Sequence, residues 1–282
     1  MEKKINFTFT KTIGLYINIL SYIMPDKALS LAYGFFSEPR RGKLSTNNLP
    51  GILKEAKLET SSHNNHQFQT YTWQGNENKI LLVHGWESNA SRWEKLIRLL
   101  LKSGSTIIAI DAPAHGLSSG KEFNVPTYAE FINAFSKTHQ PNIIIGHSMG
   151  GVACAYYQHN YQQNHVQKMI LLGSPSDFNI LMQKYINLLG LNNKVNLLIK
   201  TYIKQRFNIN TDEFTSHNFL KKTTISGIIA HDIHDDVVSF SEAKKIASAW
   251  KNAHFIETKN LGHSMQDDTL NHTIYQFLFE VI

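Results

Sequence analysis

The chain has 282 residues, 42% of them hydrophobic and 18% charged, which is enough to bury a substantial core in one large domain. The formal net charge of +6 is modest for this length, and no basic stripe with interleaved aromatic residues occurs, which argues against a nucleic-acid-binding protein. The single cysteine, Cys154, excludes an intramolecular disulfide and suits a reducing compartment, so we expect a cytoplasmic location.

The N-terminal segment, residues 1–50, begins with basic residues followed by an apolar run at 13–24. This is the outline of a signal peptide, but the run contains several polar residues and no convincing cleavage site follows. Pro25 ends the run before the ~20 apolar residues that a membrane span requires. We expect two amphipathic helices that separate at Pro25 and pack on the core, with weak membrane-surface contact and a peripheral membrane location as the alternative.

The next part of the chain alternates between strand and helix patterns. Short apolar, β-branched segments predict strands at 68–73, 79–85, 106–112, 142–148, 168–174, 226–232 and 253–259. Helical patterns occur at 91–102, 127–137, 150–159, 241–251 and 268–279. The alternation predicts an α/β fold, with a mostly parallel central sheet and helices on both faces, built from residues 51–175 and 223–282. In such sheets ligands bind beyond the carboxyl ends of the strands.

Residues 176–222 interrupt this alternation and predict a small helical lid insertion. The segment carries seven basic residues against three acidic ones. Two interpretations stay open: a solvated helical face, or a role in the choice of an anionic or lipid-like substrate.

The segment from Gly146 to Gly150 reads GHSMG and matches G-x-S-x-G, directly between a predicted strand and a predicted helix. A sharp strand-to-helix turn strains the backbone of Ser148, so the residues two positions before and after it must be small. The N-terminus of the helix then directs amide donors toward a developing oxyanion. The motif at this junction predicts a nucleophilic serine.

A serine hydroxyl needs a base, and a carboxylate must orient that base. His263 is the best candidate base because its Gly-His loop follows the last predicted strand. The segment after the preceding strand offers Asp232, Asp235 and Asp236 as carboxylates. Two histidines in that segment suggest a metal site, but nothing supplies metal geometry, and we expect neither a metal nor a cofactor.

With these motifs in order, the sequence resembles the α/β-hydrolase fold superfamily, specifically its lidded serine-hydrolase branch of esterases, lipases and thioesterases. The matching segments are VHGWES (83–88), DAPAHGLSSG (111–120), GHSMGG (146–151), HDIHDDVV (231–238) and GHS (262–264). Their order is nucleophile, acid and histidine, as in the superfamily.

The resemblance implies that Ser148 is the nucleophile, His263 the base and Asp235 the acid of a catalytic triad. The family pattern around the acid is H-G-x-x-D-x-x-V-P, from which Asp232 and Ser239 depart. Some members place the acid one strand earlier, which leaves Asp177 as the alternative acid.

The resemblance also implies an oxyanion hole made by the backbone amides of Trp86 and Met149, with the Trp86 ring facing the pocket. Asp111 and His115 lie in a loop that is usually structural in the family. We expect Cys154 to be a packing residue, and His147 beside the nucleophile need not act as a base.

These residues predict a serine hydrolase that cleaves a small-molecule carboxylic ester or thioester through an acyl-serine intermediate. An acyltransferase or a peptidase with the same triad stays open, and so does a non-catalytic ligand-binding or receptor protein on this scaffold. The sequence specifies neither the acyl group nor the oligomeric state.

Overall fold

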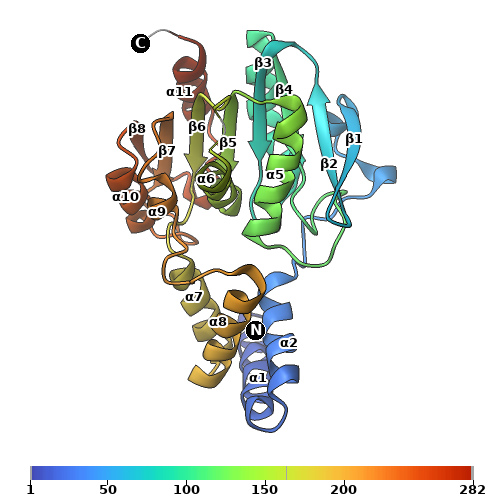
Figure 1. Ribbon diagram of the computed structural model, residues 1–282, viewed down its shortest axis with the longest axis vertical. Coiled ribbons are helices and arrows are strands. Elements are labelled where there is room, and N and C mark those ends of the chain that lie inside the picture. Colours follow the sequence, from blue (N-terminus) through green and yellow to red (C-terminus); the bar gives the residue numbers. More distant parts are fainter. Residues whose placement is uncertain (1, 163, 281–282) are drawn as a thin grey trace. The chain divides into compact units, whose positions relative to one another are not determined.

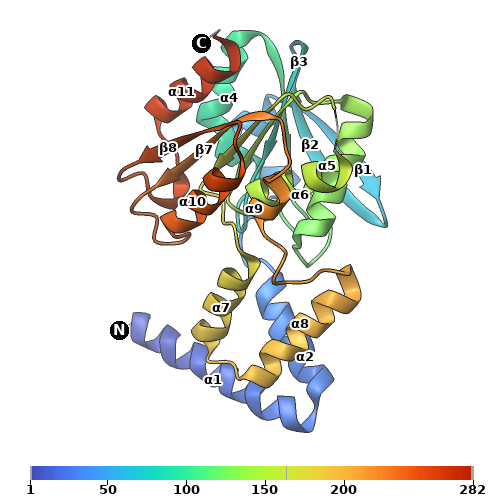
Figure 2. The ribbon, with the colours of Figure 1, turned by 60° about the vertical axis from the view of Figure 1, so that its left-hand side comes forward.

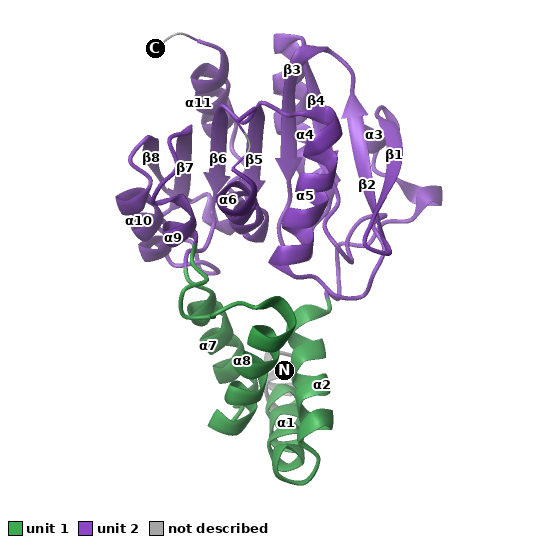
Figure 3. Cartoon of the chain, in the orientation of Figure 1, with its two compact units in different colours: residues 1–38, 177–215 green, residues 39–176, 216–282 purple. Residues whose placement is uncertain are grey.

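The computed structural model describes residues 2–162 and 164–280, which divide into two compact units (Figure 3). Unit 1 contains the chain up to Glu38 together with residues 177–215. Unit 2 contains residues 39–176 and the chain from Ser216 onward. Each unit has its own arrangement of secondary structure.

Unit 2 is built on an eight-stranded sheet with the order β1-β2-β4-β3-β5-β6-β7-β8 (Figure 1). Strands β3 to β8 are parallel, whereas β1 pairs with β2 and β2 pairs with β4 in antiparallel fashion. The bounds are β1 (Lys57–His63), β2 (His66–Trp73), β3 (Asn76–Val83), β4 (Ser105–Ile110), β5 (Ile143–His147), β6 (Lys168–Leu172), β7 (Ser226–Asp232) and β8 (Ala253–Thr258).

Helices cover both faces of this sheet (Figures 1 and 2). One layer contains α5 (Val125–His139), α6 (Met149–Tyr161), α9 (Ser216–Leu220) and α10 (Phe240–Ala249). The other contains α3 (Gly51–Lys54), α4 (Glu94–Leu100) and α11 (Asp268–Phe279). Short 3₁₀ turns complete the unit at η1 (Thr46–Asn48), η2 (Ala90–Trp93), η3 (Leu101–Ser103) and η4 (Gly262–Ser264).

The central strands explain why the sheet is covered on both sides. Every residue of β4 and β5 is buried, so their unbroken apolar runs are what a doubly covered parallel sheet requires. In β3, Ile80 and Leu82 belong to the core beneath α3, α4 and α11. Leu81 and Val83, which alternate with them, are equally buried. The expected α/β fold with a mostly parallel sheet is confirmed.

Unit 1 contains four helices, α1 (Glu2–Ile23), α2 (Pro25–Ser37), α7 (Phe178–Leu189) and α8 (Asn193–Phe207). Their buried side chains form one core, which joins Ile17 and Ala32 to Ile186 and Ile199. The break at Pro25 lies where the sequence indicates it, because proline is tolerated in the first turn of a helix but not inside one.

The expected segment boundaries differ from these units. We expected residues 1–50 to pack on the α/β core and 176–222 to form a separate insertion. The structure instead groups the chain up to Glu38 with residues 177–215, because the apolar faces of α1 and α2 are buried against α7 and α8. Among the described helices, none is both long enough and apolar enough to cross a membrane.

Candidate active site

Ser148 lies on the turn between β5 and α6, with a backbone conformation of φ 52° and ψ −123°. This strained geometry is held by its own amide, which donates to the Leu172 carbonyl at 2.9 Å. A side chain at Gly146 would meet the Gly151 Cα at 2.6 Å, and one at Gly150 would collide with the Val83 carbonyl oxygen. The two glycines of the motif are therefore required by close backbone packing on either side of the serine.

His263 lies in the η4 turn that follows β8, and it contacts both expected partners. Its Nε2 is 2.9 Å from Ser148 Oγ, and its Nδ1 is 2.8 Å from Asp235 Oδ2. Asp235 accepts from Nδ1–H, so Nε2 carries the lone pair that accepts the serine hydroxyl proton. The structure thus brings the three expected residues together in the order serine, histidine, aspartate.

Asp235 is held in the ionised form by several donors. Burial opposes its ionisation, but hydrogen bonds from His231, His263 and the Val238 amide outweigh burial and lower the pKa of this carboxyl. The amides of Val237 and Val238 both donate to Oδ1 at 2.8 Å, which leaves Oδ2 for the histidine. Asp235 therefore combines a fixed orientation with a negative charge beside His263.

The other candidate carboxylates lie elsewhere. Asp177 belongs to unit 1 and precedes α7, and Asp236 is exposed to solvent. Asp232 is buried and accepts from the Leu261 amide and the Thr258 hydroxyl, both at 2.9 Å. Where the family pattern has glycine, Asp232 ties the end of β7 to the loop that leads into His263.

Ser239, the second departure from the family pattern, is the N-cap residue of α10. Its hydroxyl accepts from the Ser241 amide, so serine satisfies a helix-terminal donor at a position where the family has proline.

The expected oxyanion donors lie next to the serine. Met149 is the first residue of α6, so its amide has no partner within the helix. Gly85 lies against the nucleophile, since a Cβ on Gly85 would be 2.9 Å from Ser148 Cβ. The Trp86 amide belongs to the peptide unit that Gly85 begins.

His84 fixes the orientation of that peptide unit. The Ala112 amide donates to His84 Nε2 at 3.0 Å, so Nδ1 carries the proton and donates to the Gly85 carbonyl at 2.8 Å. In a trans peptide the carbonyl and the following N–H point in opposite directions, so a fixed Gly85 carbonyl also fixes the direction of the Trp86 N–H. Complete burial of His84 lowers its pKa well below the usual value and keeps the ring neutral.

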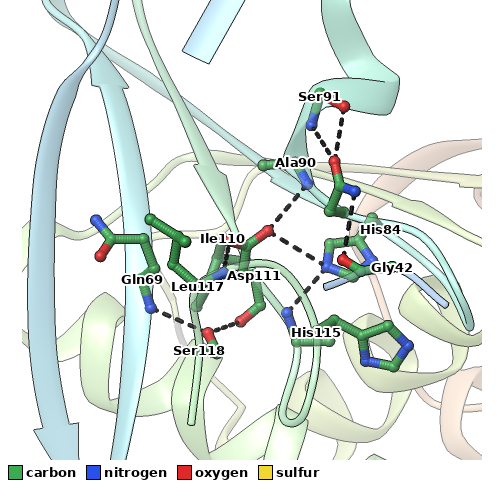
Figure 4. A network of polar contacts seen from close by, with 12 residues as sticks. Gly42, Gln69, His84, Ala90, Ser91, Ile110, Asp111, His115, Leu117 and Ser118 are labelled. Carbon is green, nitrogen blue, oxygen red and sulfur yellow. Dashed lines mark hydrogen bonds and ion pairs between the residues drawn. The ribbon is translucent and has the colours of Figure 1, made fainter. Parts of the chain in front are cut away.

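The loop after Trp86 is held by Asp111 and His115, and Figure 4 shows the bond from the Ala90 amide to Asp111. Asp111 Oδ1 accepts from the Ala90 amide at 3.0 Å, and His115 Nε2 accepts from the Glu87 amide at 2.9 Å. Glu87 has a positive φ of 49°, so this loop needs such anchors to keep its shape. Burial lowers the pKa of His115 to about 4, which leaves the ring neutral. Asp111 and His115 thus hold the backbone of the loop that follows Trp86, which agrees with the structural role expected for them.

Three further residues have defined surroundings. The Trp86 ring meets His115 and Phe123 edge-on, so its expected place in a substrate pocket stays a prediction. Cys154 is fully buried, with its sulfur beneath Gly146. Burial raises the pKa of the Cys154 thiol, which suits the expected packing role.

His147 is buried, and its Nε2–H donates to the His263 carbonyl at 2.7 Å. It therefore connects the turn that carries Ser148 to the turn that carries His263.

Sequence reasoning missed two of these supporting histidines, His84 and His231. His231 Nε2 is 2.9 Å from the Val238 carbonyl and 3.3 Å from Asp235 Oδ2, so it steadies the loop of the acid. Both histidines end or directly follow a buried strand, at the sheet edge where the other polar groups gather. That position is the signal that could have found them.

Comparison with known proteins bears on the fold that carries these residues. The model of the α/β hydrolase fold family matches residues 78–192. Human serine hydrolase-like protein 2 is 32% identical over 138 residues, which is 47% of this chain and 43% of that protein. Monoacylglycerol lipase of Mycolicibacterium smegmatis is 29% identical over 103 residues, 33% of this chain and 36% of the lipase. The matches thus span less than half of either relative.

Solved structures extend the likeness to a larger part of the chain. Bromoperoxidase from Bacillus anthracis superposes with a TM-score of 0.62 at 17% identity, covering 79% of this chain and 99% of that one. At this identity the likeness concerns the fold. The matched segment, the strand order and the superposition together show that this chain has the α/β-hydrolase fold.

Proposed function

We propose that this protein is a serine hydrolase that cleaves a carboxylic ester or thioester through an acyl-serine intermediate. The observation that carries the proposal is the continuous contact from Ser148 Oγ to His263 Nε2 and from His263 Nδ1 to Asp235 Oδ2, at 2.9 and 2.8 Å. The strained backbone of Ser148 and its place at the start of α6 support the same conclusion.

In the first half of the proposed reaction, Ser148 Oγ attacks the carbonyl carbon of the substrate while His263 Nε2 accepts the hydroxyl proton. The carbonyl π electrons move to oxygen, and the resulting oxyanion accepts from the amides of Met149 and Trp86. When the tetrahedral intermediate collapses, the bond to the alcohol or thiol breaks and His263 donates its proton to that leaving group. Asp235 stabilises the imidazolium throughout.

In the second half, water attacks the acyl-serine carbonyl and gives a proton to His263. Collapse of the second intermediate returns that proton to Ser148 Oγ and releases the acid. The steps balance with water as the only co-reactant. A serine nucleophile does not suit the dehalogenase and epoxide-hydrolase chemistry of the superfamily, which needs a carboxylate at this position.

We further propose that residues 176–222 select an anionic or lipid-like acyl group. The support is the basic character of this segment and its attachment beyond β6, where the Ser216 amide donates to the Ser176 carbonyl at 2.9 Å. Lys200, one of these basic residues, pairs with Asp212 at 3.1 Å. Two results together would refute this selectivity. The native chain would turn over acyl-CoA no better than short uncharged esters, and a Lys200→Ala/Lys204→Ala variant would turn over acyl-CoA at the same rate.

Covalent labelling with a fluorophosphonate probe tests the proposed activity, because such probes react only with an activated serine. We expect the native chain to be labelled and Ser148→Ala to be unlabelled. Ser174→Ala is the matched control, since Ser174 is buried as well and its hydroxyl donates to the Pro175 carbonyl. This variant should still be labelled. A folded native chain that takes up no label would favour the alternative of a ligand-binding protein on this scaffold.

Acyl transfer and peptide cleavage would use the same triad, so labelling does not separate them from hydrolysis. A panel of esters, thioesters and amides, with analysis of the products, assigns the reaction. Release of free acid from esters or thioesters supports the proposal. Transfer of the acyl group to an added alcohol or amine in preference to water would identify an acyltransferase instead. Cleavage restricted to amides would identify a peptidase instead.

A further inference from the structure

Helix α1 has apolar side chains on two different faces. Ile17 and Leu20 point into the core of unit 1. Leu15, Ile19 and Ile23 follow the spacing i, i+4 and i+8 on another face and are 60%, 51% and 71% exposed. One apolar face explains the packing of α1 within unit 1, and the second is left in contact with water.

Exposed apolar side chains are concentrated around this helix. Of the eleven large hydrophobic residues that are exposed in the described chain, nine belong to unit 1. The nine are Phe9, Leu15, Tyr16, Ile19, Tyr22, Ile23, Met24, Leu188 and Leu197. Seven of them lie between residues 9 and 24, and we call these seven the α1 face. Scattered apolar residues are normal on a protein surface, but a group confined to one helix marks an interaction surface.

Basic residues predominate among the charges near the α1 face. Between Glu2 and Asp26 the chain contains no acidic residue. Helices α7 and α8 contain none either, whereas they carry Lys184, Lys194, Lys200, Lys204 and Arg206. The Lys194 ammonium lies 4.5 Å from the centre of the Tyr22 ring, so a positive charge directly adjoins the exposed apolar side chains.

The signs of these charges indicate which kind of partner binds to the α1 face. A second copy of the chain, docked by the same face, would bring basic helices against basic helices. An anionic lipid surface supplies both an apolar layer for the side chains and negative headgroups for the lysines. Tyr16 and Tyr22 suit the same boundary, because tyrosine has an apolar ring and a polar tip.

We propose that the α1 face docks this protein on the surface of an anionic lipid bilayer. Because the opposite side of α1 is buried in unit 1, the helix lies in the plane of the membrane and does not cross it. The docking depends on unit 1 alone and stands independently of the proposed hydrolase activity.

Sedimentation of the full chain with lipid vesicles tests the proposal. We expect the native chain to sediment with vesicles of phosphatidylcholine and phosphatidylglycerol, less with phosphatidylcholine alone, and less as salt is raised. The double variant Ile19→Glu/Ile23→Glu should reduce the partition coefficient at least about tenfold, since it places two charges where apolar side chains enter the lipid. The matched control is Leu58→Glu, an exposed apolar residue of unit 2, which should bind as the native chain does.

The positions of the double variant point away from the core, so its thermal unfolding and its turnover of a water-soluble ester should match those of the native chain. Failure of the native chain to bind anionic vesicles, or equal binding by the double variant, overturns the proposal. A dimer in sedimentation velocity that the double variant dissolves assigns the face to a second copy, which also overturns it. A native chain that binds the vesicles but takes up no fluorophosphonate label would refute only the proposed enzymatic function.

Discussion

Three aspartates lie within five residues at the end of β7, and the structure gives them three different environments. Asp232 holds the loop before His263, Asp235 contacts His263 itself, and Asp236 is exposed. From the residues alone all three were open candidates for the acid, because residue type indicates the chemistry and not the direction of a side chain. The resemblance to a family pattern selected Asp235, and the contact with His263 is consistent with that choice.

The role of Asp235 can be separated from that of Asp177 by matched substitutions. Asp235→Asn replaces an acceptor by an amide that can donate to Nδ1, which favours the tautomer with the proton on Nε2 and removes the base facing Ser148. We expect kcat to fall roughly 10⁴-fold with little change in thermal stability. Asp177→Asn should leave kcat within about twofold of the native value; the reverse result in steady-state kinetics would make Asp177 the acid.

At the level of elements, the central parallel strands β4 and β5 were predictable because they are short β-branched runs buried on both sides. Strand β1 was not predicted, because it is an edge strand whose residues are mostly exposed and polar. The partner of the N-terminal helices was also missed. Helical periodicity identifies an apolar face on α1, but it does not reveal that α7 and α8 supply the opposing surface.

The loop from β8 to η4 offers an element-scale prediction. Asp232→Gly restores the family residue but removes the acceptor for the Leu261 amide and the Thr258 hydroxyl. We expect faster hydrogen exchange at the Leu261 amide and a kcat roughly tenfold lower, because losing buried hydrogen bonds of about 1–3 kcal/mol each loosens the segment before His263. Asp236→Ala, which removes an exposed carboxylate nearby, should change neither quantity. Unchanged exchange in Asp232→Gly would show that the loop is held by other contacts.

For the whole molecule, three buried histidines determine how stability responds to mild acid. Burial lowers the pKa values of His84, His115 and His147, that of His115 to about 4. In the unfolded chain a histidine binds a proton below about pH 6.5. The unfolded state therefore binds more protons than the folded state as the pH falls from about 6.5 toward 4, and the free energy of unfolding must decrease over that range.

The size of this effect can be measured by urea denaturation at pH 7 and pH 5. His115 should lower the free energy of unfolding by about 2 kcal/mol at pH 5, since its folded pKa of about 4 lies below that pH and 1.5 pH units at about 1.36 kcal/mol each separate that pH from the unfolded pKa. His115→Gln should reduce the loss by about that amount, whereas His272→Gln, at an exposed position, should not. A free energy of unfolding that stays constant between the two pH values would contradict the assignment of neutral rings.

The composition of unit 1 from two distant stretches of chain has a consequence for protein synthesis. Helices α1 and α2 leave the ribosome before α7 and α8, and the helices that cover their buried faces follow only after the roughly 140 residues of the intervening segment. At translation rates of about 5–20 residues per second, the apolar side chains of α1 wait on the order of ten seconds or more for α7 and α8. During that time both apolar faces of α1 are exposed on the nascent chain. The protein therefore depends on chaperones more during its synthesis than in its folded state.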